Sequence, residues 1–222
     1  MVYVTGDTHG DKSYFQTPQM KKLKKDDTVI ICGDFGFVWD GDKSEQKVLK
    51  WLSERKYKIA FVEGTHENFD LLKSYPETEI WGAKARHLGG NIYMLLKGEI
   101  YTIEGKTFLA FGGGVVDESS DLLDSTEVFL GSHTTSQEVA NAKANLDKYD
   151  WKVDYIITHD TTTKVKSFIM IEQDHSYLLN TFLDELYTNC KYKRWFFGCY
   201  HMDKIITPQV TGVFAKVIAL DK

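Results

Sequence analysis

The chain has 222 residues, of which 42% are apolar and 14% aromatic, and these proportions are typical of a globular protein with a sizeable core. The formal charge of −5 does not favour bulk binding to nucleic acid, because sequence-independent contacts to phosphates need a broad basic surface. The three cysteines do not suggest a disulfide framework, and no apolar run approaches the roughly 18 residues of a membrane span. We therefore expect one cytoplasmic domain over residues 1–222, with no membrane partner and an oligomeric state that the composition leaves open.

The first ten residues place a short apolar strand directly before a polar loop. Residues 2–4 suit a buried strand, and Asp7 and His9 follow it with one residue between them. Two side chains at this spacing share one side of an extended segment, so both could reach a single cation. Gly6 and Gly10 allow the backbone to turn sharply around them. Taken alone, this pattern is more often a polar turn than a metal site.

The next segment, residues 12–25, is polar and amphipathic, and it ends in a group of lysines. These are Lys21, Lys22, Lys24 and Lys25. They form either an anion-binding edge or a helix C-terminus whose dipole they complement, and the second interpretation is favoured. Residues 28–34 are then an apolar run without alternation, which predicts a strand buried on both faces and ending at Asp34. Cys32 within it is expected to be a small core residue.

A strand, helix, strand pattern follows. Residues 43–57 carry apolar side chains at helical spacing, and residues 58–62 predict a strand. That strand stops before Gly64 and His66, so it also ends in a glycine and a histidine. Residues 68–74 predict a short helix that ends before a proline.

Residues 91–111 predict two or three strands, with a turn at residues 104–106. The glycine triplet at residues 112–114 is either a phosphate-cradling loop or a tight turn. Because it lacks the Lys-Ser/Thr pair of a P-loop, the turn is favoured. Residues 115–136 are polar and are expected to form a surface excursion beside the site, with a role that composition does not define.

The last third of the chain repeats the alternation of helices and strands. Residues 137–149 predict a helix, and residues 153–159 predict a strand that ends in a histidine. Asp174 is expected to be the N-cap of a helix over residues 176–187. Two further β-rich segments are residues 194–201 and 205–220.

Four of the seven histidines follow predicted strands, and so do two aspartates. These residues are Asp7, His9, Asp34, His66, His159 and His201. In open α/β sheets the carboxyl ends of the strands form one rim where ligands bind, so five segments would deliver metal-ligating groups to one place. Imidazole and carboxylate together suit Zn, Mn or Fe. The remaining histidines, His87, His133 and His175, have no such context and are expected to be surface or packing residues.

Five short blocks carry a resemblance to a known family. They are Gly6–Gly10, Gly33-Asp34, Gly64–Glu67, Thr158-His159 and Gly198–His201. In order, spacing and position they resemble the motifs of the calcineurin-like metallophosphoesterases. The resemblance implies a four-layer α-β-β-α sandwich of two mixed β-sheets flanked by helices, with a dinuclear metal site at one edge. It also implies that a first metal ion is held by Asp7, His9, Asp34 and His201.

The second metal site implied by the resemblance departs from the family pattern. Its ligands would be Asp34, Thr65, His159 and Cys199, where the family has an asparagine at position 65 and a histidine at position 199. A threonine hydroxyl is a poor ligand, whereas a cysteine thiolate is a strong, soft one that favours Zn or Fe. Asp160 and Thr161 also stand where the family usually has a small apolar residue and a proline. The sequence therefore predicts one or two divalent transition-metal ions (Mn, Zn or Fe).

In the family, a metal-bound hydroxide attacks phosphorus, and the resemblance gives the bridging role to Asp34 and the protonation of the leaving oxygen to His66. Three functions stay open: a phosphoesterase with an altered second site, a one-metal enzyme, and a former enzyme that binds a nucleotide, a phosphate or a protein partner. Substrate identity is open as well. Four aromatic residues near the loops either stack on a substrate or belong to the core, which is favoured. They are Phe35, Phe37, Trp39 and Trp81.

Overall fold

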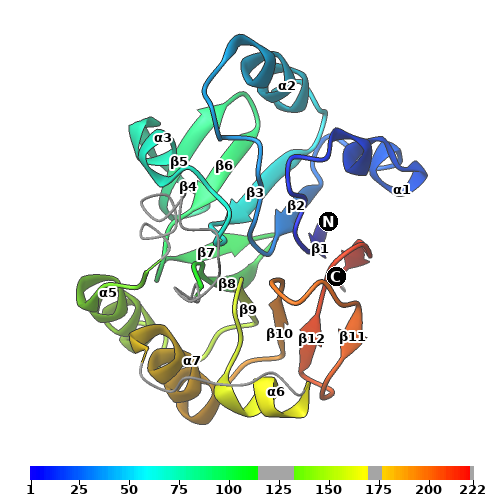
Figure 1. Cartoon of the computed structure of the whole chain (residues 1–222). Coiled ribbons are helices and arrows are strands. Elements are labelled where there is room, and N and C mark those ends of the chain that lie inside the picture. The colour runs from blue at the N-terminus through cyan, green and yellow to red at the C-terminus, as the bar shows by residue number, and fades with distance from the viewer. Residues whose placement is uncertain (115–132, 170–176, 221–222) are drawn as a thin grey trace, which may run out of the picture.

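The computed structural model describes residues 1–114, 133–169 and 177–220. Two β-sheets pack face to face, and helices cover the outer face of each, so the order of layers is helix, sheet, sheet, helix (Figure 1). This arrangement confirms the predicted four-layer α/β sandwich. Within the described ranges, no helix combines the length and the apolar character needed to cross a bilayer.

The seven-stranded sheet has the order β13-β1-β2-β3-β6-β5-β4. Its central strands run parallel: β1 (Val2–Thr5), β2 (Thr28–Ile31), β3 (Lys58–Val62) and β6 (Ile92–Leu95). Its outer strands are antiparallel to their neighbours: β4 (Glu77–Ile80), β5 (Ala83–Gly89) and β13 (Ile218–Ala219). Every residue of β2 is buried, as its uninterrupted apolar pattern predicts.

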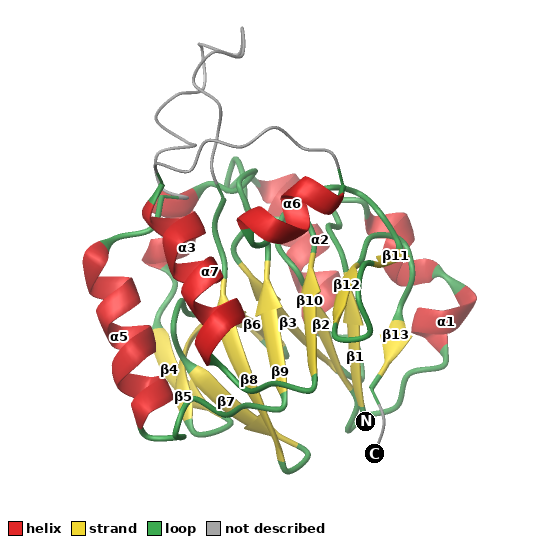
Figure 2. Cartoon of the chain, turned by 90° about the horizontal axis from the view of Figure 1, so that it is seen from below, coloured by secondary structure: helices red, strands yellow, loops and turns green. Residues whose placement is uncertain are grey.

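The six-stranded sheet has the order β11-β12-β10-β9-β8-β7. Four strands run parallel: β8 (Lys106–Phe111), β9 (Tyr155–Thr158), β10 (Arg194–Phe197) and β12 (Val210–Gly212). The antiparallel edges are β7 (Ile100–Ile103) and β11 (Lys204–Ile205). In Figure 2 the arrows of β9 and β10 point to the same edge of the molecule.

Helices flank the two sheets and bury their apolar faces. Over the seven-stranded sheet lie η1 (Lys12–Gln16), α1 (Pro18–Lys21), α2 (Lys43–Ser53) and α3 (Phe69–Ser74). Over the six-stranded sheet lie α5 (Ser136–Asp147), α6 (Thr163–Phe168) and α7 (Leu178–Asn189). A third apolar cluster fills the space between the sheets and includes Ile30, Phe108 and Phe196. The three clusters hold the two sheets and their helices in fixed register.

Residues 12–25 form a 3₁₀ turn, η1, and a single α-helical turn, α1, and Lys21 lies in the last turn of α1, in line with the favoured interpretation of the lysines. Two other expectations about secondary structure are wrong in detail. The helix expected from residue 176 begins at Leu178 and has Tyr177 at its N-cap, while Asp174 lies outside the described residues. The strands β4 and β5 and the helix α6 were not predicted. Most of the predicted surface excursion at residues 115–136 also falls outside the described ranges.

Candidate metal centre

The predicted ligands converge at one edge of the sandwich and come from both sheets. Asp7 and His9 follow β1 and Asp34 follows β2 in the seven-stranded sheet, whereas His159 follows β9 and His201 follows β10 in the six-stranded sheet. Parallel strands bring their carboxyl ends to a common rim, and here the rims of the two sheets meet.

The first group contains the residues expected to hold the first ion. Asp7 Oδ2 lies 3.2 Å from His201 Nε2, and His9 Nε2 lies 2.9 Å from the same His201 atom. His9 Nε2 is also 3.9 Å from Asp34 Oδ2. The ligating atoms of Asp7, His9 and His201 all lie within 4.8 Å of one another, which is compact enough for one cation. The aspartates are buried and the two imidazoles are exposed, so the group opens toward solvent on its histidine side.

Asp34 is fixed by the loop that follows β3. Its Oδ1 accepts hydrogen bonds from the backbone N–H groups of Thr65 at 2.7 Å and His66 at 2.8 Å, and its Oδ2 lies 3.0 Å from His66 Nδ1. Burial alone would raise the pKa of Asp34, but His159 and His66 outweigh burial and hold it well below its ordinary range. The hydrogen bond to Asp34 raises the pKa of His66. Asp34 is therefore an ionised carboxylate at neutral pH, with a fixed orientation.

His159 lies buried between the two aspartates. Its Nδ1 is 3.0 Å from the carbonyl oxygen of Cys32 and 3.6 Å from Asp7 Oδ1, and its Nε2 is 3.6 Å from Asp34 Oδ1. Burial alone would lower the pKa of His159, but the neighbouring Cys199 and Asp34 raise it well above its ordinary value. Because Nδ1 is directed at the carbonyl, Nε2 is the atom that a metal ion would bind in place of a proton.

Two buried atoms in this group lack a hydrogen-bond partner among the described residues: Asp7 Oδ2 and His159 Nε2. Buried polar atoms are normally paired, and both of these atoms are common metal ligands. The donor set of Asp7, Asp34 and His159 also lies within 4.8 Å. The residues present therefore fit a divalent transition-metal ion.

The two altered positions lie beside this set but outside it. Thr65 Oγ1 is 3.1 Å from His66 Nδ1, so the hydroxyl contacts a neighbouring imidazole. The Cys199 thiol lies near His159, and burial raises the pKa of this thiol. Among the described His, Cys, Asp and Glu side chains, Cys199 belongs to none of the groups compact enough to hold a cation.

The backbone around the site is in a conformation that most residues avoid. Four ligand-loop residues have positive φ angles, 45° at His9, 42° at Asp34, 59° at Cys199 and 46° at His201. Such strain gathers at functional sites, where the surrounding structure enforces it. A Cβ atom at Gly64 would collide with the Asp34 carboxylate, which explains why the third block needs glycine there.

The predicted aromatic residues divide between core and surface. Phe35 and Phe37 are buried in the core beneath the helices, as favoured from the sequence, and Trp81 packs against the core between the sheets. Trp39 is 38% exposed. His87 stacks on Tyr93 away from the site.

Glu67 is a site-supporting residue to which the sequence analysis gave no role. Its carboxylate accepts hydrogen bonds from the backbone N–H groups of Phe35 at 2.7 Å and Gly36 at 3.2 Å, and so it ties the loop after β3 to the loop that carries Asp34. Burial and the Asp34 charge raise the pKa of Glu67 to about 8. The only sequence signal was its position directly after His66.

A buried polar network behind the site was also missed. Asp160 Oδ2 accepts a hydrogen bond of 2.6 Å from Lys166 Nζ, and Asp160 Oδ1 accepts one of 2.7 Å from the Tyr200 hydroxyl. Lys166 also donates to Asn180 Oδ1 at 3.2 Å. The network links the loop after β9 to the loop that carries Cys199 and His201. The unusual aspartate at position 160 was noticed in the sequence, but nothing there predicted its partners.

The family model for calcineurin-like phosphoesterases matches residues 1–205 of the 222-residue chain. No curated protein matches the chain in sequence. Among solved structures, the chain is similar to AQ665, a protein of unknown function from Aquifex aeolicus, with 15% identity, 86% of this chain and 87% of that chain covered, and a TM-score of 0.38. It is also similar to the phosphopantetheinyl hydrolase PptH from Mycobacterium tuberculosis, with 12% identity, 96% and 87% coverage, and a TM-score of 0.47.

The family model covers β1 to β11 and the loops that carry the predicted ligands and His66. The resemblance seen in the five sequence blocks is thereby confirmed, and the chain belongs to the calcineurin-like phosphoesterase family, whose members are metal-dependent phosphoesterases.

Proposed function

We propose that the protein hydrolyses a phosphate ester with a divalent transition-metal ion, Mn, Zn or Fe, bound by Asp7, His9, Asp34 and His201. The observation that carries this proposal is the convergence of these side chains around Asp7 Oδ2 and His159 Nε2, two buried ligand atoms that make no hydrogen bond within the described residues. An ion bound there supplies positive charge that stabilises the phosphoryl oxygens and lowers the pKa of a water molecule.

The role proposed for His66 is protonation of the leaving oxygen. Its ring is half exposed, with a side-chain exposure of 54%, so it can reach a substrate at the mouth of the site. Its Nδ1 is held by Asp34, so Nε2 is the ring nitrogen proposed to contact the substrate. A histidine oriented in this way, with a pKa raised by its hydrogen bond to Asp34, is suited to the role of general acid.

The second half of the centre is proposed to be altered. Asp34 and His159 are the two family ligands that remain, and a catalytic site of zinc type usually has three protein ligands. Cys199 is the candidate for the third, because its thiol already contacts His159. Without Cys199 the second ion would be weakly held, and the protein would work with one ion.

A second candidate function is binding without turnover, with a nucleotide, a phosphate or a protein as the partner. The absence of Cys199 from the cation-binding groups of the described residues favours it, because without Cys199 as a ligand a bridging pair of ions would be absent.

The experiment that separates these functions is elemental analysis of anaerobically purified protein, combined with turnover of an aryl phosphate monoester and diester. We expect at least one Mn, Zn or Fe ion per chain, with loss of metal and of turnover in His9→Ala and Asp34→Ala. His87→Ala is the matched control, because His87 lies outside the site. A wild type that takes up neither Mn nor Zn contradicts the metal proposal, and a metal-loaded protein that turns over neither ester supports the binding function.

A further inference from the structure

Away from the metal centre, a pocket of about 290 Å³ lies between α1 and the segment that follows α2. Its lining includes Lys21 from α1 and Arg55, Lys56 and Tyr57 from that segment. Residues 54–57 precede β3, whereas His66 follows it. Since a five-residue strand spans about 16 Å, the pocket and the metal centre lie at opposite ends of β3.

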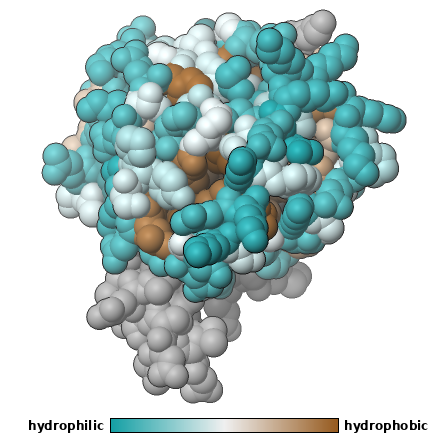
Figure 3. All heavy atoms as spheres, turned by 90° about the horizontal axis from the view of Figure 1, so that it is seen from above, coloured by the Kyte–Doolittle hydropathy of each residue, from teal (hydrophilic) through white to brown (hydrophobic). Residues whose placement is uncertain are grey.

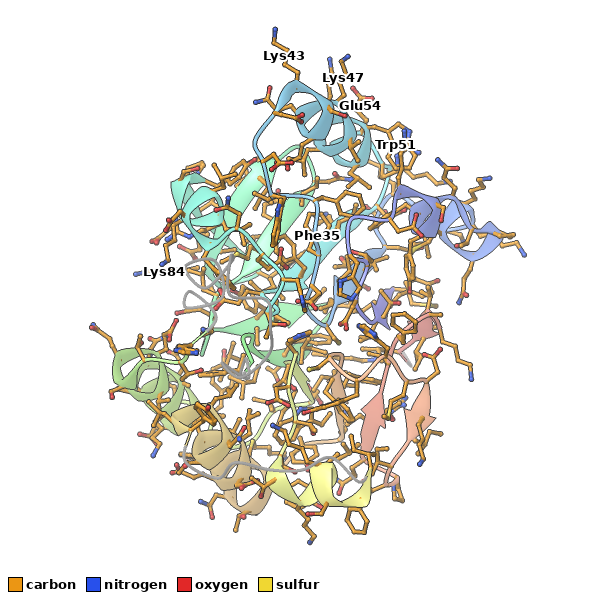
Figure 4. The ribbon with its side chains drawn as sticks, in the orientation of Figure 1. Phe35, Lys43, Lys47, Trp51, Glu54 and Lys84 are labelled. Atoms are coloured by element: carbon orange, nitrogen blue, oxygen red, sulfur yellow. The ribbon has the colours of Figure 1, made fainter. Side chains whose placement is uncertain are left out.

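Positive charge gathers around this pocket without a matching counter-charge. Lys12 Nζ lies 4.5 Å and Arg55 Cζ lies 4.1 Å from the centre of the Trp51 ring. Figure 4 shows Trp51 extending from α2 on the side that faces η1 and α1. Within the described part of the chain, no ion pair involves Lys12, Lys21, Arg55 or Lys56.

The lining contains one carboxylate, that of Glu54, and three cationic side chains. The local balance is therefore positive in a chain whose net charge is −5. Figure 3 shows that the face carrying α2 is largely hydrophilic, with small hydrophobic areas between the charged side chains. Like charges held together in this way lower the free energy of a bound anion.

Tyr57 lines the pocket but is almost entirely buried. It is 3% exposed, and its hydroxyl, which solvent does not reach, makes no hydrogen bond among the described residues. Burial raises the pKa of Tyr57 to about 12, so the phenol is neutral and can donate. The Asn91 side chain donates to the carbonyl oxygens of Arg55 and Tyr57, and this fixes the segment in place. A buried donor without an acceptor is rare in folded proteins.

The floor of the pocket is apolar. Phe15 and Met20 line it and are 2% and 0% exposed. A floor of this kind lowers the local dielectric constant and strengthens the attraction between the cations and a bound anion.

We propose that this pocket is an anion-binding site separate from the metal centre, and that its ligand is a phosphate group, either free or carried by a small ester. Two lysines and an arginine around one pocket suit a dianion better than a single carboxylate. Of the lysines in residues 12–25 that were weighed as an anion-binding edge, Lys21 is the one that lines the pocket.

The test is NMR titration of the Trp51 indole N–H signal, assigned with Trp51→Phe, against inorganic phosphate and glycerol phosphate at constant ionic strength. We expect a saturable shift, with an affinity that weakens at least tenfold in Lys21→Ala/Lys56→Ala. The matched control is Lys43→Ala/Lys47→Ala, which removes the same charge from α2; Figure 4 shows both lysines pointing into solvent away from the pocket. The relative affinities for the two ligands show which source of phosphate the pocket prefers.

Asp34→Ala separates this site from the metal centre. The titration is expected to be unchanged in that variant, which lacks a metal ligand, and so the pocket can be confirmed even if the proposed hydrolysis fails. The proposal is overturned by the absence of a saturable shift with either ligand, by equal weakening in the Lys43/Lys47 control, or by loss of the shift in Asp34→Ala. As a second measurement, phosphate should raise the melting temperature of the wild type more than that of Lys21→Ala/Lys56→Ala.

Discussion

His66 Nδ1 lies 3.0 Å from Asp34 Oδ2, while both backbone N–H groups at positions 65 and 66 donate to Asp34 Oδ1. The carboxylate that faces His9 and His159 therefore also sets the orientation and the protonation of His66. Asp34, a proposed metal ligand, thus holds His66, the proposed proton donor. We expect a change at Asp34 to reduce both metal content and turnover, and a change at His66 to reduce turnover alone.

Replacement of His66 is expected to reduce hydrolysis without removing metal. In His66→Gln the side chain no longer titrates, and the loss of a positioned acid lowers the rate by roughly 10²-fold or more. Steady-state kinetics with an aryl phosphate and elemental analysis of the same sample measure both effects. Unchanged kcat in the variant would remove His66 from the mechanism.

Restoration of the family residues at both altered positions is expected to rebuild the second half of the centre. Thr65→Asn/Cys199→His would supply an amide oxygen and an imidazole in addition to Asp34 and His159, giving four ligands. We expect a second ion per chain and a rise in turnover of roughly tenfold or more, which corresponds to about 1.4 kcal/mol of transition-state stabilisation.

The opposite result has a definite meaning. If Cys199 already ligates a second ion, the wild type holds two ions and loses the second one when oxygen oxidises the thiolate. The double variant then gains little metal or turnover. The single variants Thr65→Asn and Cys199→His show which position limits occupancy.

The buried pair of Asp160 and Lys166 is expected to be essential for stability. Lys166→Met would leave the Asp160 carboxylate buried without its cation, and breaking such a pair costs about 3–5 kcal/mol. Asp160→Asn/Lys166→Met, which removes both charges, should recover part of that loss. Urea denaturation at pH 7 measures each difference, and a loss under about 1 kcal/mol in the single variant would mean that the pair behaves like a solvated one.

The pH dependence of stability can be tested at Asp154, far from the metal ligands. Partial burial would raise its pKa, but the 2.7 Å ion pair with Lys193 and the hydrogen bonds from Thr107 lower it below the ordinary 3.8. Because the folded pKa is depressed, the stabilisation is complete above the unfolded value and is lost as the pH falls through the folded value.

Asp154→Asn should therefore be less stable than the wild type at pH 7, with a difference that shrinks below about pH 4. Denaturant unfolding of both proteins at pH 7, 5 and 3 gives the comparison. A difference that grows toward acid pH would show that Asp154 is not stabilised as an anion.

The parts of the fold that the sequence predicts well are those with uninterrupted apolar runs. Residues 58–62 were predicted as a strand with the bounds that β3 has, and β2 lies inside the predicted run at residues 28–34. The loops after these strands carry Asp34 and His66, so the approximate position of the site followed from the strands themselves.

The missed elements have weak or short signals. In β5 the inward positions include Ala83 and Ala85, whose small side chains hardly mark a buried face, and outward positions are charged. The helix α6 has six residues, fewer than two turns, and shows no clear period.

The sequence could not predict the contacts that support the ligands. Lys166 reads as a solvent-exposed lysine, and only the packing of α6 and α7 buries it against Asp160. The position of Cys199 depends on its positive φ angle, which no residue pattern in the sequence around it predicts.

His9 and His201, whose Nε2 atoms are 2.9 Å apart, are separated by 192 positions in the sequence. A ribosome makes the chain from its N-terminus, so Asp7 and His9 exist long before their partner from β10 emerges. During synthesis the early residues can hold a cation only loosely, and a tightly bound ion has to wait until almost the whole chain has been made. Loading of the proposed ion is therefore expected to be a late event, after both sheets have come together.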